Sequence, residues 1–269
     1  NNKIINDIIL IIKNSSINTK IFFKFIMKKK ISSDFLVVIP ARMNSKRLPN
    51  KPLIKILGKE ILLRTYLQCL KVVDNNKILI ATDSRKIIKF CKLNSINCIK
   101  TSSNCITGTD RVAEVAKKIK KSFYINVQGD EPIFNPKDLK KIIENSKQNS
   151  NLVYNGFSKI LEKKDYNNPN IPKAVMCNNN FLIYMSRSPI PGNKLNRFRY
   201  SHRQICIYSF PRSLLLKFSN NKKTFNEEIE DIEILRFLDL GYKVKMVKMS
   251  KDSISIDTKS DLKKVKLKL

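Results

Sequence analysis

The chain has 269 residues and a mass of 31.2 kDa, a length that suits one large domain or two small ones. Hydrophobic residues make up 42% and charged residues 28%, a composition that excludes a disordered or fibrous protein. The 53 Lys and Arg outnumber the 22 Asp and Glu, but the excess is mostly Lys scattered along the whole chain, so nucleic-acid binding stays a remote alternative.

Cysteine and histidine usage limits the possible chemistry. The six cysteines form no CxxC pair, and the single histidine, His202, cannot complete a Cys/His zinc site. The cysteines are interpreted as reduced intracellular thiols. With one histidine, Ser-His-Asp and Cys-His mechanisms are also disfavoured. Chemistry in this chain must therefore rest on carboxylates, Lys, Arg, backbone amides or a hard metal ion.

The first 33 residues differ from the rest. They carry seven Lys against one Asp, with short apolar segments interrupted by polar residues. They lack the longer apolar stretch and the small-residue cleavage site of a signal peptide. No run of about eighteen apolar residues occurs in the sequence, so we expect no membrane span. We expect residues 1–33 to be an extension that is disordered or not native, with residues 1–26, before Met27, outside the natural folded protein.

The organised part of the sequence begins with an apolar run. Residues 35–40 (FLVVIP) are rich in β-branched side chains, which is typical of a strand buried on both faces of a parallel sheet. Further strands are predicted at residues 77–82, 98–100 and 123–127. Helices are predicted at residues 61–73, 85–93, 109–120 and 136–147, with Ser84 and Asn135 as N-caps. This alternation predicts a doubly wound, mostly parallel α/β sheet.

The second half has a different pattern. Its predicted strands span residues 152–160, 173–176, 181–185 and 204–209, with little helix between them. This pattern suggests antiparallel additions to the sheet or a dimerisation arm. A helix over residues 226–240, a strand over 242–249 and a last helix capped by Thr258 complete the chain. Because the sequence has no repeat and no long linker, we predict a single α/β domain.

Ligands of open α/β sheets bind at the carboxyl ends of the strands, so the loops after strands should carry the chemistry. The loop after the first strand holds four cations, Arg42, Lys46, Arg47 and Lys51, around Ser45. Guanidinium and ammonium groups can neutralise several adjacent phosphate oxygens, so this loop predicts a polyphosphate site. The alternative is a solvated basic loop. The GxxxxGK[ST] pattern of a Walker A loop is absent.

A second loop, VQGDEP at residues 127–132, directly follows a predicted strand. An acidic pair there suits Mg²⁺ held by one or two carboxylates plus phosphate oxygens, and Gly129 would let a ligand approach the backbone. Asp257 also ends an apolar run and could meet Asp130 over one metal ion. The alternatives are a structural turn at Asp130 and a helix-capping role for Asp257, which Thr258 could perform instead.

A third loop, CITGTDR at residues 105–111, places Thr107, Gly108 and Thr109 before a predicted helix. The free N–H groups of a helix N-terminus favour a polar or anionic ligand. Many helices begin in this way, so the loop indicates a ligand only together with the other two.

These segments together resemble a known family. The sequences IPAR-x(2)-S-x-R-LP-x-KPL, ATD, TGTDR, NVQGDEP, SRSPIP and IDT-x(2)-DL occur in the order and spacing of the cytidylyltransferases that activate 3-deoxy-manno-octulosonate (Kdo), the CMP-Kdo synthetases. The resemblance covers about residues 35–265, and NVQGDEP together with SRSPIP is its most specific part.

The resemblance implies an enzyme that joins CTP and Kdo to give CMP-Kdo and pyrophosphate for lipopolysaccharide biosynthesis. It implies Mg²⁺ as cofactor, a nucleotide-diphospho-sugar transferase fold, a cytidylyltransferase domain over residues 34–269, a cytoplasmic location and a homodimer. No nucleic-acid or membrane partner is expected. The alternative is a cytidylyltransferase for another 2-keto sugar acid, such as an 8-substituted Kdo or a nonulosonate.

Matching positions imply roles for individual residues. Contacts with CTP are implied for Arg42, Ser45, Arg47, Lys51, Thr107, Gly108, Thr109 and Arg111. Contacts with the sugar acid are implied for Gln128, Arg187, Gln204, Tyr208 and Glu233, with Arg187 as the candidate for its carboxylate. Asp130 and Asp257 are the implied metal ligands. The predicted catalytic residues are Arg42, Arg47, Lys51 and Asp130.

Three positions depart from the family pattern. Asn50 replaces a usual Gly, a mild change because Asn tolerates the left-handed backbone conformation. Gln204 stands in place of a histidine and Ile234 in place of a glutamine, both in the expected sugar pocket. A pocket that has lost hydrogen-bonding groups discriminates less sharply, so we expect an enzyme that accepts Kdo but tolerates a substituted relative.

The amino-terminal extension gives a first prediction. Deletion of residues 1–26 should leave both the free energy of unfolding and the turnover unchanged, because we place these residues outside the folded protein. Urea denaturation and an activity assay of the shortened and full chains check this. A large loss of either property would contradict the expectation.

Overall fold

Strand β1 (Phe35–Ala41) lies at the centre of the structure, and all seven of its residues are buried. It pairs in parallel with β4 (Ile78–Thr82) and β6 (Phe123–Val127). Because neighbouring strands cover both edges and helices cover both faces, such a strand requires an uninterrupted apolar run. The computed structural model describes residues 34–43, 47–195, 197–251 and 253–269, so the predictions for residues 1–33, Ser45 and Lys46 lie outside the described residues.

The main sheet has the strand order β11-β7-β10-β6-β1-β4-β5. Its other strands are β5 (Cys98–Lys100), β7 (Val153–Ile160), β10 (Ser201–Pro211) and β11 (Val244–Lys248). Strand β10 runs antiparallel to β6 and β7, whereas β11 pairs in parallel with β7. Strands β8 (Lys173–Met176) and β9 (Leu182–Ser186) join β10 as antiparallel additions. The predicted mostly parallel sheet with antiparallel additions is confirmed.

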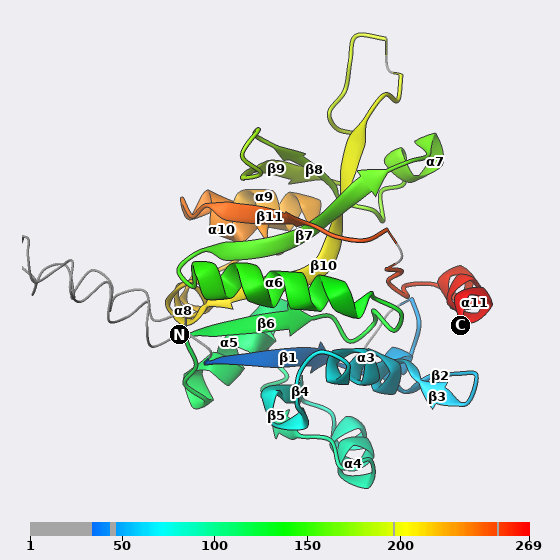
Figure 1. Ribbon diagram of the computed structural model, residues 1–269, viewed down its shortest axis with the longest axis vertical. Coiled ribbons are helices and arrows are strands. Elements are labelled where there is room, and N and C mark those ends of the chain that lie inside the picture. Colours follow the sequence, from blue (N-terminus) through cyan, green and yellow to red (C-terminus); the bar gives the residue numbers. More distant parts are fainter. Residues whose placement is uncertain (1–33, 44–46, 196, 252) are drawn as a thin grey trace, which may run out of the picture. The chain divides into compact units, whose positions relative to one another are not determined.

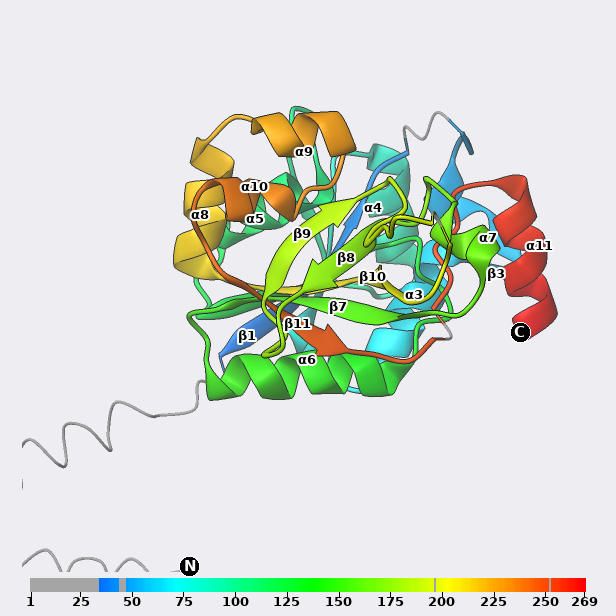
Figure 2. The ribbon, with the colours of Figure 1, turned by 90° about the horizontal axis from the view of Figure 1, so that it is seen from above.

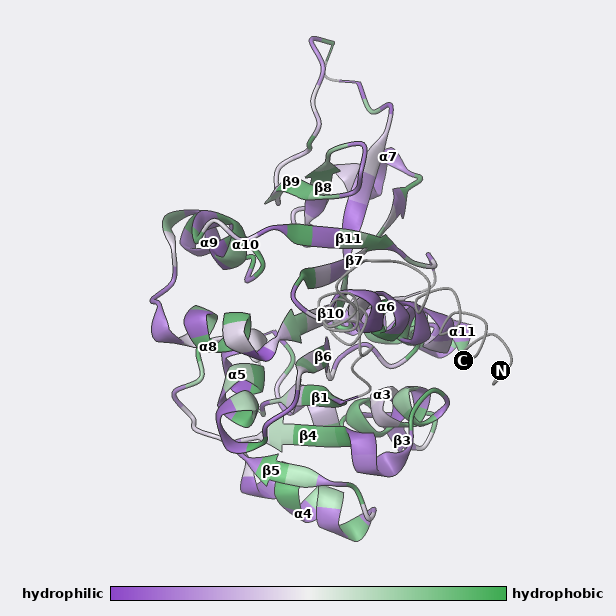
Figure 3. Ribbon diagram, turned by 60° about the vertical axis from the view of Figure 1, so that its left-hand side comes forward, coloured by the Kyte–Doolittle hydropathy of each residue, from purple (hydrophilic) through white to green (hydrophobic). Residues whose placement is uncertain are grey.

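Helices cover both faces of the sheet (Figure 2). One layer contains α3 (Ile61–Leu70), α4 (Arg85–Leu93) and α6 (Pro136–Gln148). The other contains α5 (Gly108–Lys118), α8 (Arg212–Asn220) and α10 (Leu235–Asp239). Alternate side chains of β1 pack against opposite helix layers. Val37 belongs to the core cluster on the side of α3, α4 and α6, and Val38 to the cluster on the side of α5, α8 and α10. Figure 3 colours the residues by hydropathy: strand β4, inside the sheet, is hydrophobic, and helix α6, on its face, is mostly hydrophilic.

Local capping signals place several boundaries where the sequence predicted them. Helix α4 has the predicted bounds, and the Ser84 hydroxyl accepts a hydrogen bond from Ile87 N at 3.4 Å. Asn135 caps α6 by accepting from Lys137 N at 3.0 Å.

The sequence did not predict several short elements. These are α7 (Lys163–Tyr166), α8, β2 (Lys55–Ile56), β3 (Lys59–Glu60), and the 3₁₀ helices η1 (Lys51–Leu53) and η2 (Asn75–Lys77).

The single helix predicted over residues 226–240 is wrong. The structure has α9 (Phe225–Glu230) and α10 instead, and Asp231 ends α9 with a left-handed φ of 48°. The break turns the Glu233 carboxylate toward the N-terminus of α5, where it accepts hydrogen bonds from Gly108 and Thr109. Helical periodicity could not reveal this break, because the partners of Glu233 lie far away in the sequence.

A buried arginine secures this region. Arg236 is 2% exposed, and its guanidinium donates to the two carboxylate oxygens of Glu227 at 2.5 and 2.6 Å. It also donates to Asp110 at 3.1 Å and to the carbonyl oxygens of Phe218 and Asn221 at 3.2 and 3.3 Å. Arg236 therefore joins four helices, α5, α8, α9 and α10.

The last helix, α11 (Lys259–Lys268), begins after the predicted cap Thr258, which forms a capping box with Asp261. It packs through Val265 in a small third core cluster with Leu48 and Ile56. The connection between β9 and β10 extends away from the sheet (Figure 1). Among the described helices, none has the length and the apolar character needed to cross a membrane.

Arg236→Met tests the buried network. The change removes the charge, keeps much of the side-chain length and leaves Glu227 buried without its partner. Breaking a buried ion pair in this way costs about 3–5 kcal/mol, so we expect the free energy of unfolding to fall by at least about 3 kcal/mol in urea denaturation. Arg85→Met, at the exposed start of α4, is the matched control and should change the free energy by less than about 0.5 kcal/mol. Equal losses in the two variants would argue against this role.

Candidate active site

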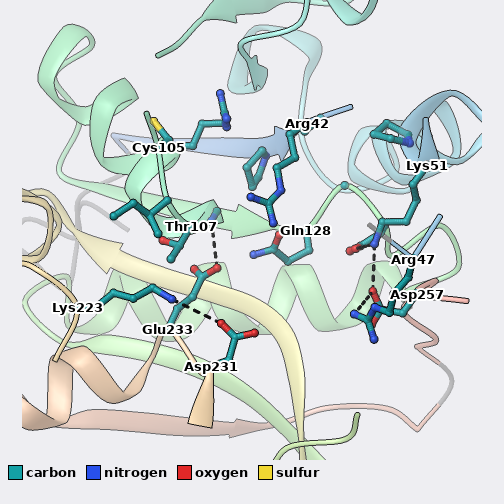
Figure 4. Close-up of a pocket in the computed structure, with 18 residues that line it drawn as sticks. Arg42, Arg47, Lys51, Cys105, Thr107, Gln128, Lys223, Asp231, Glu233 and Asp257 are labelled. Atoms are coloured by element: carbon teal, nitrogen blue, oxygen red, sulfur yellow. Dashed lines mark hydrogen bonds and ion pairs between the residues drawn. The ribbon is translucent and has the colours of Figure 1, made fainter. Parts of the chain in front are cut away.

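A cavity of about 820 Å³ lies at the carboxyl ends of β1 and β6, where open α/β sheets bind ligands. The predicted site residues that line it are Arg42, Arg47, Lys51, Thr107, Gly108, Arg111, Gln128, Asp130, Glu233 and Asp257. In Figure 4, Arg42 and Gln128 lie between a group around Lys51 on one side and a group around Glu233 on the other. The structure thus brings the three predicted loops together in one cavity.

On the first side, Lys51 lies between two carboxylates. Its Nζ is 2.5 Å from Oδ2 of Asp130 and 3.2 Å from Oδ1 of Asp257. Arg47 also pairs with Oδ1 of Asp257, at 3.1 Å. Two cations and two carboxylates balance each other here. Asp130 and Asp257 therefore meet, as the sequence predicted, but around an ammonium group of the chain itself.

The backbone around Lys51 is fixed locally. Asn50 has φ 57° and ψ 21°, the left-handed conformation that Asn was expected to tolerate, and Lys51 then begins η1 with Pro52 buried behind it. Burial lowers the pKa of the Lys51 ammonium, but the charges and hydrogen bonds of Asp130 and Asp257 raise it by more. The pKa of Lys51 therefore lies above its usual value, and the side chain stays charged.

Asp257 is held beside Asp130 by the backbone. The N–H of Ile256 donates to the carbonyl oxygen of Asp130 at 3.0 Å. The helix-capping alternative for Asp257 does not apply, since the Thr258 hydroxyl caps α11 by accepting from Asp261 N at 3.3 Å. The Asp257 carboxylate is therefore available to the cavity.

The second acid of the VQGDEP loop has a different environment. Glu131 is buried, lies outside the cavity lining and accepts a hydrogen bond from the Ser253 hydroxyl. Burial raises the pKa of the Glu131 carboxyl to about 7, although the hydrogen bond from Ser253 opposes this rise. Glu131 thus secures the segment that leads to Asp257, and of the two acids in this loop only Asp130 lines the cavity.

The second side of the cavity is built on the N-terminus of α5. Gly108 and Thr109 donate their backbone N–H groups to the Glu233 carboxylate at 3.0 and 2.9 Å, and the Thr109 hydroxyl donates at 2.5 Å. Burial raises the pKa of Glu233, and these hydrogen bonds oppose the rise. In this structure the anionic partner of the N–H groups is a carboxylate of the chain itself.

The remaining residues of this loop serve the helix. Thr107 lines the cavity and forms a capping box with Asp110, whereas Thr109 does not line it. Arg111 lines the cavity with a buried guanidinium that donates to Thr101 at 2.5 Å and pairs with Asp83 at 3.4 Å. The guanidinium of Arg111 is thus already bound within the wall.

The predicted sugar-acid residues divide into two groups. Gln128 and Glu233 line the cavity, whereas Arg187, Gln204 and Tyr208 do not. The Gln204 amide donates to the side chain of Asn155 at 3.0 Å. Tyr208 belongs to the second core cluster, and burial raises the pKa of its hydroxyl well above the usual value.

Arg187 supports the break between α9 and α10. Its guanidinium donates to the carbonyl oxygens of Glu230 at 2.6 Å and of Pro169 and Asp231 at 2.9 Å. The fork expected to bind a sugar carboxylate therefore binds backbone oxygens in this structure.

Ile234 does not lie in the cavity, so its expected place in the sugar pocket is wrong. Its side chain is 1% exposed and packs in the second core cluster. Consecutive residues point in different directions, and the residue before it, Glu233, takes the side that faces the cavity. An apolar side chain at position 234 is therefore what the core requires.

Sequence reasoning missed part of the cavity wall. Lys223 and Asp231 line it and form an ion pair at 3.6 Å. Cys105 and Ile106 line it as well. Cys105 and Ile106 begin the CITGTDR motif, which is the sequence signal that could have indicated their place in the cavity wall. No local pattern marks Lys223, which reaches the cavity because Arg236 fixes the chain between α8 and α9.

Comparison with known proteins shows the family of the chain. Residues 36–248 match the family model described as cytidylyltransferase. A 3-deoxy-manno-octulosonate cytidylyltransferase of Fusobacterium nucleatum is 36% identical over 233 residues, 86% of this chain and 95% of that protein. The mitochondrial 3-deoxy-manno-octulosonate cytidylyltransferase of Arabidopsis thaliana is 32% identical over 243 residues, 88% of this chain and 83% of that protein. The chain belongs to the family of 3-deoxy-manno-octulosonate cytidylyltransferases.

Solved structures confirm the fold class. A CMP:2-keto-3-deoxy-manno-octonic acid synthetase complexed with CTP has a TM-score of 0.81 and 30% identity, covering 87% of this chain and 98% of that one. The 4-diphosphocytidyl-2C-methyl-D-erythritol synthase of Anaerococcus prevotii shares the fold with a TM-score of 0.59 at 14% identity, covering 88% of this chain and 97% of that one. This member of the family is a nucleotidyltransferase, as its motifs predicted.

Gly129 tests how closely the cavity loops must pack. A Cβ here would lie 2.9 Å from the carbonyl oxygen of Pro40, so this glycine, which also lines the cavity, admits the end of a neighbouring strand. We expect Gly129→Ala to lower the free energy of unfolding by about 1–3 kcal/mol in urea denaturation. Gly192→Ala is the matched control, because a Cβ there meets nothing within 4 Å. Equal stability of the two variants would contradict the close approach.

Proposed function

We propose that this protein is a cytoplasmic enzyme that activates Kdo with CTP, giving CMP-Kdo and pyrophosphate for lipopolysaccharide biosynthesis. The observation that carries the proposal is the meeting of loop cations, the carboxylates of Asp130 and Asp257 and a helix N-terminus in one cavity of about 820 Å³. A cavity of this size is typical of small-molecule sites. The names of relatives at 32% and 36% identity and a similar structure complexed with CTP support it.

The phosphates of CTP would lie beside the loop after β1. Arg42, Arg47 and Lys51 line this side and offer guanidinium and ammonium donors, which bind phosphate oxygens well. Thr107 and Gly108 line the other side, where the resemblance implies contacts with the cytidine. Gln128 and Glu233 would contact the sugar acid.

The carboxylates of Asp130 and Asp257 fit a Mg²⁺ ion. Both are hard oxygen donors, and they already share a cation, the Lys51 ammonium, at 2.5 and 3.2 Å. Among the residues described, no three His, Cys, Asp or Glu form a metal-binding group, so phosphate and water oxygens would complete the coordination. When bound, the ion would neutralise charge on the phosphates.

The reaction depends mainly on positioning. The 2-hydroxyl oxygen of the sugar acid forms a bond to the α-phosphorus of CTP, the bond from that phosphorus to the departing pyrophosphate breaks, and the hydroxyl proton is released to solvent. Arg42, Arg47 and Lys51 would stabilise the negative charge that collects on pyrophosphate. Catalysis of this kind is mostly positioning and charge neutralisation, which the cationic loop would supply without a histidine base.

We also propose a homodimer. The exposed apolar side chains include Ile183 on β9 and Leu195 and Tyr200 in the connection between β9 and β10. They lie in the strand-rich half of the chain that suggested a dimerisation arm, where association with a second copy would cover exposed apolar side chains. Sedimentation equilibrium measures the assembly directly, and a monomer at all concentrations would refute this part of the proposal.

Pyrophosphate release tests the proposed activity. Each nucleoside triphosphate is paired with Kdo, an 8-substituted Kdo and a nonulosonate, with Mg²⁺ present. We expect release with CTP and Kdo. Gln204 and Ile234 do not line the cavity, so the tolerance of a substituted relative expected from these two positions has no support in the structure. Release only with a nonulosonate would favour the alternative substrate class, and no release with CTP and any sugar acid would refute the proposal.

The two carboxylates provide a residue-level prediction. Asp130→Asn and Asp257→Asn should each lower kcat at least about a hundredfold, about 3 kcal/mol of transition-state stabilisation, because each removes a charge from the metal site. Asp74→Asn, at an exposed position outside the cavity, is the matched control and should keep normal turnover. If both cavity variants fold and keep near-normal turnover, the metal assignment is wrong.

A further inference from the structure

The Lys51 ammonium lies where a cation shared by Asp130 and Asp257 would bind. Its Nζ is 2.5 Å from one carboxylate and 3.2 Å from the other. A Mg²⁺ ion bound to the same oxygens would lie about 2.1 Å from each of them. The ammonium and the ion therefore cannot hold this position together, and their like charges also repel.

The cluster is held by its backbone as well as by its charges. The hydrogen bond from Ile256 N to the Asp130 carbonyl keeps the two carboxylates close, and η1 fixes the base of Lys51. The Lys51 side chain is 14% exposed, so water and salt screen its ion pairs only weakly. The ammonium therefore needs another strong partner before it leaves the carboxylates.

The charges of the cluster are already balanced. Asp130 and Asp257 face Lys51 and Arg47, which pairs with Asp257 at 3.1 Å. A divalent cation added to this cluster would give it two excess positive charges. The phosphates of a nucleotide supply several negative oxygens, which are alternative partners for both the ammonium and the guanidinium.

We propose that Lys51 is an internal counter-ion that keeps a divalent cation away from Asp130 and Asp257 until the phosphates of a nucleotide withdraw its ammonium. This rests on the proposed function, because the phosphates of CTP are the new partner of Lys51. Nucleotide and metal ion then bind cooperatively, and each raises the affinity of the protein for the other.

Mn²⁺ binding to the nucleotide-free protein tests this role, with unbound Mn²⁺ measured by electron paramagnetic resonance. We expect Lys51→Met, which removes the charge and keeps the length, to bind Mn²⁺ at least about tenfold more tightly than wild type. Lys51→Arg keeps the charge and should stay near the wild-type affinity. Lys55→Met is the matched control, because Lys55 is exposed and lies outside the cavity.

A second substitution locates the bound ion. Asp257→Asn introduced into the Lys51→Met protein should abolish the gain, because one of the two carboxylates is then neutral. Lys51→Gln, a second charge-free variant, should reproduce the gain, and thermal unfolding shows that each variant is folded. Equal Mn²⁺ affinities of wild type and both charge-free variants would overturn the proposal, as would a gain that Asp257→Asn leaves intact. No CTP or sugar is present, so this outcome is separate from that of the pyrophosphate assay.

Discussion

The buried Arg236 guanidinium determines one wall of the cavity. Its hydrogen bonds to Glu227 and Asp110 join the starts of α9 and α5, and its bond to the Phe218 carbonyl secures the end of α8. An arginine suits this position because its planar fork carries five donors and keeps its charge when buried. With these helix ends fixed, the chain between α9 and α10 brings Glu233 to the N-terminus of α5. The contacts of Arg236 thus decide where Lys223 and Glu233 reach the cavity.

The opposite wall depends on charge balance. Two carboxylates this close would repel each other, and the Lys51 ammonium between them removes that cost. The loop after β1 is thereby tied to the segment before α11, which is far away in the sequence. Phosphates and a divalent cation can replace the internal partners of Lys51 and Asp257, so the charges that stabilise this wall also suit the proposed chemistry.

The two walls differ in what they offer a substrate. The Lys51 side presents exchangeable charges, whereas the carboxylate of Glu233 is already held by three donors. A pair of substrates with phosphates at one end and hydroxyl groups at the other fits this division. Between the walls, Gly129 lets the ends of β1 and β6 come close, so both groups of residues reach one cavity.

The sequence by itself determined the features that depend on neighbouring residues. An apolar run predicted β1, and two capping residues, Ser84 and Asn135, predicted where α4 and α6 begin; the structure has all three features. The family motifs predicted three loops near a ligand, and residues of all three line the cavity. Only the tertiary structure decided that α9 ends at Asp231 and that the Arg187 fork binds backbone carbonyls. These outcomes depend on hydrogen bonds between segments far apart in the chain, and helical or strand periodicity carries no record of such partners.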